Sequence, residues 1–257
     1  MNNNLKSDLQ PLITIIIATY NELFNIQKTL DSIYHQKYVN IEIIVIDGDS
    51  DDGTVDILNE NSARISYWIS EVDIGIYDAW NKALKQSSGD WIMFLGAGDC
   101  LKFNALDHYI GCINSSNGSE NFISSKGTII DSKGKDIREF GKNFDKNLFL
   151  KYMTICHPSS LHHKSLFKKY GQYDISYKIS SDYEFLLRAI SSIKPKFIDL
   201  TLVEVLDGGV SAYSYEGLYE TKLIKLTKRP KILVEIEWLL SVVKLYIKLR
   251  LLKNKVL

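Results

Sequence analysis

A strongly apolar run followed at once by a polar turn and a helix constrains this chain most. Residues 12–18 read L-I-T-I-I-I-A, which is of strand length and hydrophobic on both faces, as in a buried parallel strand. T-Y-N-E follows, and Ile26, Leu30 and Ile33 then recur at helical spacing. A second strand is predicted at 41–46. Strands that alternate with helices predict a parallel sheet with right-handed crossovers.

Two further strands with polar ends continue this pattern. We expect a third strand near 65–69, which leads into S-E-V-D-I-G-I-Y-D and a helix at 79–85. A fourth strand at 91–95 ends in G-A-G-D. Ligands of parallel α/β sheets gather beyond the carboxyl ends of the strands. We therefore expect the four polar loops to face one crevice.

The second half of the chain has a more varied pattern. It predicts a helix from 103 to about 118 and a hairpin of two strands, 123–130 and 135–140, around D-S-K-G. Two more helices are expected at 161–170 and 182–191.

Composition narrows the compartment and the partners. The 257 residues carry 31 Lys and Arg against 31 Asp and Glu. We expect no nucleic-acid partner, because such binding needs a surplus of basic residues. Three scattered cysteines, Cys100, Cys112 and Cys156, suit neither a disulfide framework nor a CxxC metal site and favour a reducing compartment. Positions 1–10 are too polar for a secretion signal, so a cytoplasmic protein is expected.

Five strings in this order resemble a family 2 glycosyltransferase: T-Y-N-E, V-I-D-G-D-S-D-D-G-T, G-I-Y-D-A-W-N-K, F-L-G-A-G-D and S-D-Y-E-F-L-L-R. The resemblance spans most of 13–211 and points to a bacterial subgroup that builds surface polysaccharides such as lipopolysaccharide O-antigen. It implies an α/β GT-A fold, with a mostly parallel, Rossmann-like central sheet flanked by helices. It also implies inverting transfer of a sugar from a nucleotide-activated donor, with a divalent metal ion at the pyrophosphate.

The resemblance also divides the chain. It implies a catalytic domain over 1–215, with a nucleotide-binding half at about 11–100 and an acceptor half at about 101–215. A helical segment follows at 216–257, where apolar residues interleave with Lys244, Lys248, Arg250 and Lys253. Such a helix either lies at a membrane surface, as in a peripheral membrane protein, or packs on the catalytic domain or on a second subunit as a homo-oligomer.

The first loop is assigned by the resemblance to the nucleoside of the donor. Ala18, Thr19, Tyr20 and Glu22 stand where the first strand opens into a helix, and the Tyr20 ring suits a flat base. The alternative is that Tyr20 is a core residue and that Glu22 merely favours a helix N-terminus.

The second loop departs from the usual family pattern. Asp47 closes the second strand, and its carboxylate suits a ribose hydroxyl or a base N–H. Family members usually carry a second acid directly after it, whereas this chain has Gly48. Either Asp49 replaces that carboxylate or backbone groups hold the base. A uridine nucleotide is the favoured donor.

The third loop resembles a subgroup pattern in which a glycine lets the chain approach the donor and an asparagine points into the crevice. Gly75, Asp78 and Asn81 are the corresponding donor-binding candidates. For Asp78 a helix cap is the alternative.

Asp99, the last residue of G-A-G-D, is the predicted metal ligand. Family members carry a D-x-D-like motif here, of which only Asp99 remains. One carboxylate is sufficient in principle, because Mg²⁺ is usually held by one or two carboxylates together with phosphates and waters. The alternative is an aspartate that caps the loop.

Asp182 matches the later acid that serves as general base in similar transferases. A helix N-terminus would lower its pKa, which counts against this role, and a plain N-cap is the alternative. Glu184 is the second candidate base.

Two loop residues complete the predicted acceptor side. The resemblance assigns His157, in C-H-P, and Gly209, in G-G-V-S, to loops that meet acceptor or phosphate. His162 and His163 lack metal-ligand spacing, so we interpret them as surface residues or as residues behind the site.

The sequence thus predicts a metal-dependent hexosyltransferase that uses Mn²⁺ or Mg²⁺. It would move a sugar from a nucleotide-sugar, preferably a UDP-sugar, to a hydroxyl of a lipid-linked or growing surface glycan. The alternative is a non-catalytic module that binds nucleotide-sugar or glycan and carries a degenerate metal motif.

Overall fold

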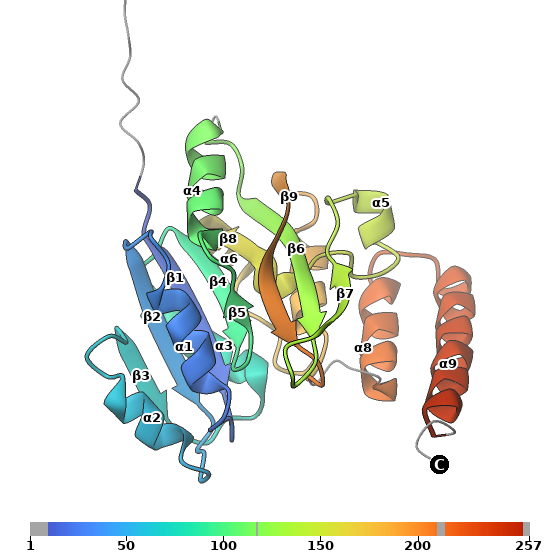
Figure 1. Cartoon of the computed structure of the whole chain (residues 1–257). Helices are drawn as coiled ribbons and strands as arrows, with labels where there is room; N and C mark the ends of the chain where they lie inside the picture. The colour runs from blue at the N-terminus through green and yellow to red at the C-terminus, as the bar shows by residue number, and fades with distance from the viewer. Residues whose placement is uncertain (1–9, 117, 210–213, 254–257) are drawn as a thin grey trace, which may run out of the picture.

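The computed structural model describes residues 10–116, 118–209 and 214–253, in which helices cover both faces of one nine-stranded sheet (Figure 1). The strands are β1 (Ile13–Thr19), β2 (Ile41–Asp47), β3 (Tyr67–Ser70), β4 (Trp91–Gly96), β5 (Cys100–Leu101), β6 (Phe122–Ile130), β7 (Asp136–Phe140), β8 (Ser160–His163) and β9 (Pro195–Leu206). The α-helices are α1 (Ile26–Tyr34), α2 (Thr54–Glu60), α3 (Ile76–Gln86), α4 (Ala105–Ser115), α5 (Lys146–Phe149), α6 (Lys164–Tyr170), α7 (Ser181–Ala189), α8 (Tyr215–Leu226) and α9 (Lys231–Lys253).

The first four strands form a parallel sheet in the order β3-β2-β1-β4, as predicted. Thr19 at the end of β1 is in register with Asp47 at the end of β2, and Asp47 is in register with Ser70 at the end of β3. The chain leaves β1 toward β2 on one side and returns to β4 on the other. The carboxyl ends of these strands therefore share one edge at a topological switch point, which is where such sheets bind ligands.

Strand β1 is buried along its whole length and supplies both hydrophobic cores. Ile13, Ile15 and Ile17 pack on one face of the sheet with α1, α2 and α4. Ile16 and Ala18 point to the opposite face, which α3 and α7 cover. This alternation explains why the strand is apolar on both sides.

The second half of the sheet is mixed. β8 pairs antiparallel with β4 and β6, β9 runs parallel to β6, and β6 and β7 form the predicted hairpin. The helix expected over 161–170 begins only at Lys164, because Ser160–His163 is strand β8. Strand β9 was not expected from the sequence pattern. Residues 160–163 form a strand because they pair with both β4 and β6, and this pairing overrides their local helical periodicity.

All three cysteines are free thiols. Within the described ranges, no helix is long and apolar enough to cross a bilayer. Helices α8 and α9 stand side by side at the end of the molecule far from β3 (Figure 1). The polar N-terminal residues 1–9 lie outside the described residues.

Gly89, in the turn before β4, offers a test of packing at the amino edge of the sheet. A Cβ there would lie 2.4 Å from Oγ1 of Thr14 and 2.7 Å from its backbone nitrogen. We expect Gly89→Ala to lower the free energy of unfolding by about 2 kcal/mol, measured by urea denaturation, because the backbone of β1 must shift.

Gly111→Ala is the matched control. Gly111 is exposed in α4, and a Cβ there would have no other atom within 4 Å. Its replacement should raise the free energy of unfolding by up to about 1 kcal/mol, because alanine is the better helix former. Equal stability of the two variants would contradict this account of β1 and β4.

Candidate active site

Asp47 organises the loop that follows β2. Its side chain is fully buried. The carboxylate accepts hydrogen bonds from the backbone N–H of Ser50 (2.9 Å) and from the hydroxyls of Ser50 (2.5 Å) and Ser70 (2.6 Å). Asp47 therefore joins the ends of β2 and β3.

The loop after β1 presents an aromatic ring at the same edge. Ala18 and Thr19 are buried in the end of the strand, whereas the Tyr20 side chain is 62% exposed. Tyr20 is therefore not a core residue, which removes the alternative interpretation of its role. Glu22 does stand at the start of α1, where its carboxylate accepts a hydrogen bond from the Asn25 amide (2.7 Å).

Gly75 and Asp78 shape the start of α3. Gly75 has a φ of +126°, and a Cβ there would have no other atom within 4 Å. The Asp78 carboxylate accepts a hydrogen bond from the Ile74 N–H (3.3 Å) and lies 3.6 Å from the Lys82 ammonium group. Asp78 thus accepts from the residue that precedes the N-cap Gly75 and does not itself cap the helix. A small surface recess lies here, between the start of α3 and the segment around 175–178.

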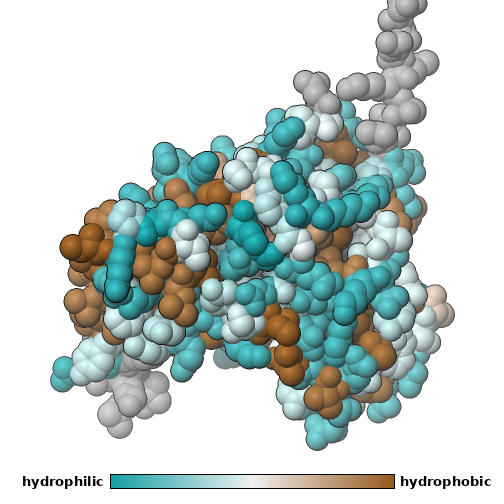
Figure 2. Space-filling model, turned by 180° about the vertical axis from the view of Figure 1, so that it is seen from behind, coloured by the Kyte–Doolittle hydropathy of each residue, from teal (hydrophilic) through white to brown (hydrophobic). Residues whose placement is uncertain are grey.

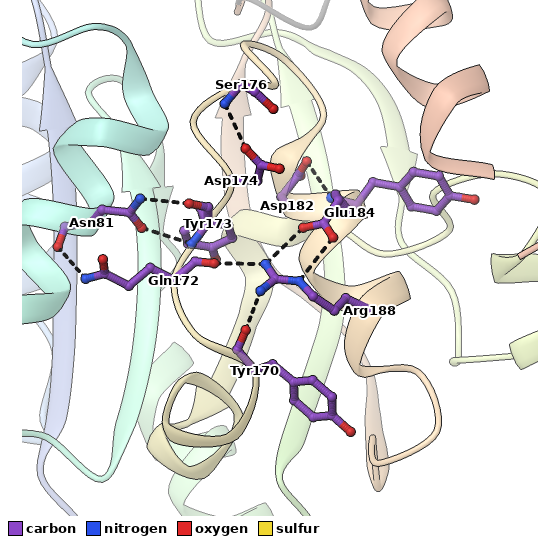
Figure 3. A network of polar contacts seen from close by, with 10 residues as sticks. Asn81, Tyr170, Gln172, Tyr173, Asp174, Ser176, Asp182, Glu184 and Arg188 are labelled. Carbon is purple, nitrogen blue, oxygen red and sulfur yellow. Dashed lines mark hydrogen bonds and ion pairs between the residues drawn. The ribbon is translucent and has the colours of Figure 1, made fainter. Parts of the chain in front are cut away.

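Asn81 corrects one prediction, since its amide does not point freely into a crevice. It is buried, its nitrogen donates to the Tyr173 carbonyl (2.9 Å), and its oxygen accepts from the Tyr173 N–H (3.0 Å), as Figure 3 shows. The Gln172 side chain adds a hydrogen bond to the Asn81 carbonyl (3.1 Å). Asn81 therefore fastens the segment after α6 to helix α3.

Asp182 lies in the first turn of α7. Its carboxylate accepts hydrogen bonds from the Tyr183 N–H (2.8 Å) and from the Tyr77 hydroxyl of α3 (3.1 Å). The side chain is half-buried by surface area, but the surrounding protein desolvates the carboxylate enough to raise its pKa to about 6. Burial thus outweighs the lowering expected from a helix N-terminus. The pKa of this carboxylate therefore lies close to neutral pH.

Glu184, the second candidate base, is already engaged. Its two oxygens accept hydrogen bonds from the Arg188 guanidinium (3.0 and 2.9 Å), as Figure 3 shows. Arg188 also donates to the carbonyls of Tyr170 and Gln172. Arg188 is not among the predicted site residues, although its spacing of four residues from Glu184 on one helix was an available signal.

Asp99 lies just beyond β4. Its side chain is 8% exposed and accepts a hydrogen bond from the Gly96 N–H (2.9 Å), so the expected loop-capping contact exists. Burial raises its pKa to about 7, and the negative charge of Glu22 adds to this effect. No group of three or more His, Cys, Asp and Glu side chains suited to a metal occurs in the described part of the chain. Asp99 would have to rely on ligand oxygens to complete a metal site.

The two buried histidines differ from expectation. His157 stacks on Trp80 with ring centroids 5.1 Å apart, and its Nε2 lies 3.1 Å from the Tyr173 hydroxyl. Burial lowers its pKa to about 3, so it is neutral and belongs to an aromatic core rather than to an exposed loop. His162 is also fully buried, which excludes the surface alternative for it and leaves a place behind the site, whereas its neighbour His163 is partly exposed.

The two remaining candidates lie in exposed loops. Asp49 is exposed with a φ of +68°, and Gly209 is exposed with open space around it. Val210 and Ser211, the rest of the predicted glycine loop, lie outside the described residues.

Asp47 and Asp99 lie at the carboxyl edge of the parallel strands, and Asp182 contacts the first turn of α3, the helix that follows β3. Asp47 ends β2 and Asp99 follows β4, with β1 between them. Asp182 reaches the first turn of α3 through Tyr77. This edge thus brings together side chains from the two halves of the chain.

Asn81→Ala tests the structural role of this residue. The variant would leave the buried N–H and C=O of Tyr173 without partners, so we expect the free energy of unfolding to fall by about 2–3 kcal/mol in urea denaturation. Asn59→Ala, at an exposed position of α2, should change it by less than about 0.5 kcal/mol. Similar losses in the two variants would contradict the contact.

Sequence comparison identifies the family. The model of Glycosyl transferase family 2 matches residues 14–171. An uncharacterized glycosyltransferase of Mycobacterium tuberculosis is 32% identical over 206 residues, which cover 79% of this chain and 78% of the relative. A PGL/p-HBAD biosynthesis glycosyltransferase of Mycobacterium bovis is 30% identical over 186 residues, 71% of each chain.

Solved structures share the fold at low sequence identity. TarS 1–349 of S. aureus in complex with UDP-GlcNAc superposes with a TM-score of 0.69 at 16% identity, covering 88% of this chain and 70% of that one. The mannosyltransferase PcManGT of Pyrobaculum calidifontis, in complex with GDP-Man and Mn²⁺, gives 0.62 at 16% identity, with 90% and 70% covered. The chain spans 42% of the longer TarS chain. It therefore has the GT-A fold and belongs to glycosyltransferase family 2.

Proposed function

We propose that this protein is an inverting hexosyltransferase that moves a sugar from a UDP-sugar to a hydroxyl of a lipid-linked or growing surface glycan. Family membership supports sugar transfer. The UDP-GlcNAc bound to TarS supports a uridine donor. The observation that carries the proposal is Asp182, a carboxylate with its pKa raised to about 6 beside the edge where the parallel strands end.

In this proposal Asp182 removes the proton of the acceptor hydroxyl as that oxygen attacks the anomeric carbon. A base works best when its pKa lies near the working pH, and burial moves Asp182 in that direction. The Tyr77 hydroxyl fixes one of its oxygens. Direct displacement by a single acceptor inverts the anomeric configuration, because bond formation and bond cleavage occur on opposite faces.

The donor would occupy the loops after β1, β2 and β3. The exposed ring of Tyr20 offers a face for the base, and Glu22 offers a carboxylate at the same edge, whereas the buried Asp47 positions the loops after β2 and β3. Gly75 leaves room for a close approach to the start of α3. We accordingly propose a nucleotide-binding half at about 11–100 and an acceptor half at about 101–215.

Asp99 is the proposed protein ligand of Mn²⁺ or Mg²⁺. The Asp99 carboxylate accepts backbone hydrogen bonds from Gly96 and Leu206, and Glu22 lies close enough for its charge to raise the pKa of Asp99. A cation would offset both negative charges, so the residues fit an ion that takes its other ligands from diphosphate and water. The bound ion would stabilise the negative charge of the departing diphosphate.

Asp182→Asn tests the proposed base. With UDP-sugar, acceptor glycan and Mn²⁺, we expect the rate of UDP release to fall at least about 100-fold. In the unsubstituted protein the rate should rise with pH through about 6, because the carboxylate must lose its proton to act. Asp56→Asn, on the exposed surface of α2, serves as the control and should retain the rate.

Stability measurements separate this loss from unfolding. A carboxylate whose pKa is raised on folding opposes the folded state at pH 7, so Asp182→Asn should be as stable or about 1 kcal/mol more stable. An unchanged rate in Asp182→Asn would remove the base assignment. Nucleotide binding without turnover of any donor would favour the non-catalytic module.

We also propose that α9 rests on an anionic membrane surface, where lipid-linked acceptors reside. Val234 and Trp238 face the protein, with the Lys222 ammonium 4.1 Å from the Trp238 ring centroid. On the opposite side, exposed apolar residues follow helical spacing: Ile232, Leu233, Ile236, Leu239, Leu240, Val243, Tyr246 and Ile247. Figure 2 shows hydrophobic side chains gathered at this end of the molecule.

Charge favours lipid as the occupant of this surface. Residues 216–257 contain ten Lys and Arg but four Glu, although the whole chain is neutral. A basic segment beside an apolar helical stripe matches an anionic lipid interface.

Leu240→Glu tests this surface. We expect the unsubstituted protein to float with phosphatidylglycerol-containing vesicles but not with pure phosphatidylcholine, and Leu240→Glu to lose at least half of the bound fraction. Leu200→Glu, at an exposed apolar position of β9, is the matched control and should still bind. A dimer that Leu240→Glu dissociates, without any vesicle binding, would assign α9 to a subunit interface instead.

A further inference from the structure

Gly48, where this chain departs from the family pattern, lies against a carboxylate from another loop. A Cβ at Gly48 would be 3.0 Å from Oδ2 of Asp73 and 3.3 Å from Cδ2 of Tyr20. The Asp73 carboxylate and the Tyr20 ring therefore border the space that a side chain at position 48 would enter. Position 73 lies in the loop after β3, 25 residues further along the chain.

The protein holds Asp73 in place and leaves one of its oxygens available. Oδ1 accepts a hydrogen bond from the Gly75 N–H (2.8 Å). Among the residues that the structure describes, Oδ2 has no hydrogen-bond partner. The loop itself is anchored by Asp47, whose carbonyl accepts from the Glu71 N–H (3.0 Å) and whose carboxylate accepts from the Ser70 hydroxyl (2.6 Å). Asp73 is thus a positioned acceptor beside an exposed aromatic ring.

Asp49, the replacement considered from the sequence, makes none of these contacts. It is exposed, and its backbone adopts the left-handed conformation with a φ of +68°. Gly48, in contrast, is directly next to the Asp73 carboxylate.

We propose that Asp73 accepts a hydrogen bond from the nucleoside of the donor and so replaces the carboxylate that position 48 lacks. This inference rests on the proposed function and names a recognition residue for its donor. A nucleoside presents a flat ring together with N–H and O–H donors, which match the Tyr20 face and the free oxygen of Asp73. Asp73 thus joins the donor-binding residues assigned from the sequence motifs.

The first test measures UDP binding by titration calorimetry in the presence of Mn²⁺. Removing a charged acceptor from a nucleoside contact should raise the Kd of Asp73→Ala about 10-fold or more. Asp73→Asn keeps a neutral acceptor, so its Kd should lie between those of the unsubstituted protein and Asp73→Ala. Glu71→Gln is the matched control, because it removes a negative charge from the same loop at a side chain paired with Lys82 (2.8 Å), and its Kd should stay within about 2-fold.

The second test moves the carboxylate. Gly48→Asp alone should weaken UDP binding, because its side chain meets Asp73 and Tyr20. Combined with Asp73→Ala, Gly48→Asp should restore the Kd to within about 3-fold of the unsubstituted protein. Rescue of this kind requires that the two positions serve the same contact, and a variant that merely fails to fold cannot produce it.

The outcomes separate this inference from the proposed function. UDP affinity that is unchanged in Asp73→Ala, or lost in it and not rescued by Gly48→Asp, would overturn the role of Asp73 while leaving sugar transfer intact. An unsubstituted protein that binds no nucleotide would overturn both. Comparison of UDP with CDP locates the contact: a larger loss for UDP indicates the base N–H, and equal losses indicate the ribose.

Discussion

Complete burial of β1 between two parallel neighbours is the constraint on which the site depends. Because alternate residues of β1 supply both cores, the strand cannot shift its register without exposing one of them. Its end is therefore fixed relative to the ends of β2 and β4. The Tyr20 ring, the Asp47 carboxylate and the turn that holds Asp99 occupy a common edge for this reason.

Burial also sets the chemistry of the acids at this edge. Asp99 and Asp182 both have raised pKa values because the surrounding protein desolvates them, although backbone N–H groups oppose the shift. Asp47 has a different role, because its carboxylate accepts three hydrogen bonds from Ser50 and Ser70 and so joins the loops after β2 and β3. Asp47 thus holds loops together, whereas Asp99 and Asp182 are the acids proposed to meet a cation and a proton.

Buried polar contacts join the two halves of the domain. Asn81 of α3 binds the backbone of Tyr173, and Tyr77 reaches both the Ile179 carbonyl and Asp182. These contacts place the start of α7 against the start of α3. The proposed base therefore depends on a connection far from its own helix, which accounts for the structural role of Asn81.

The sequence by itself determined the four parallel strands, their polar ends, the helices of the first half and the family. These features are encoded locally, in apolar runs, helical spacing and turn residues. Only the tertiary structure decided that Asn81 binds a partner 92 residues away, that His157 and His162 are buried, that residues 160–163 form a strand, and that Asp73 lies over Gly48. Such contacts join segments distant in the chain, and burial, which sets the pKa of Asp182, exists only after those segments pack.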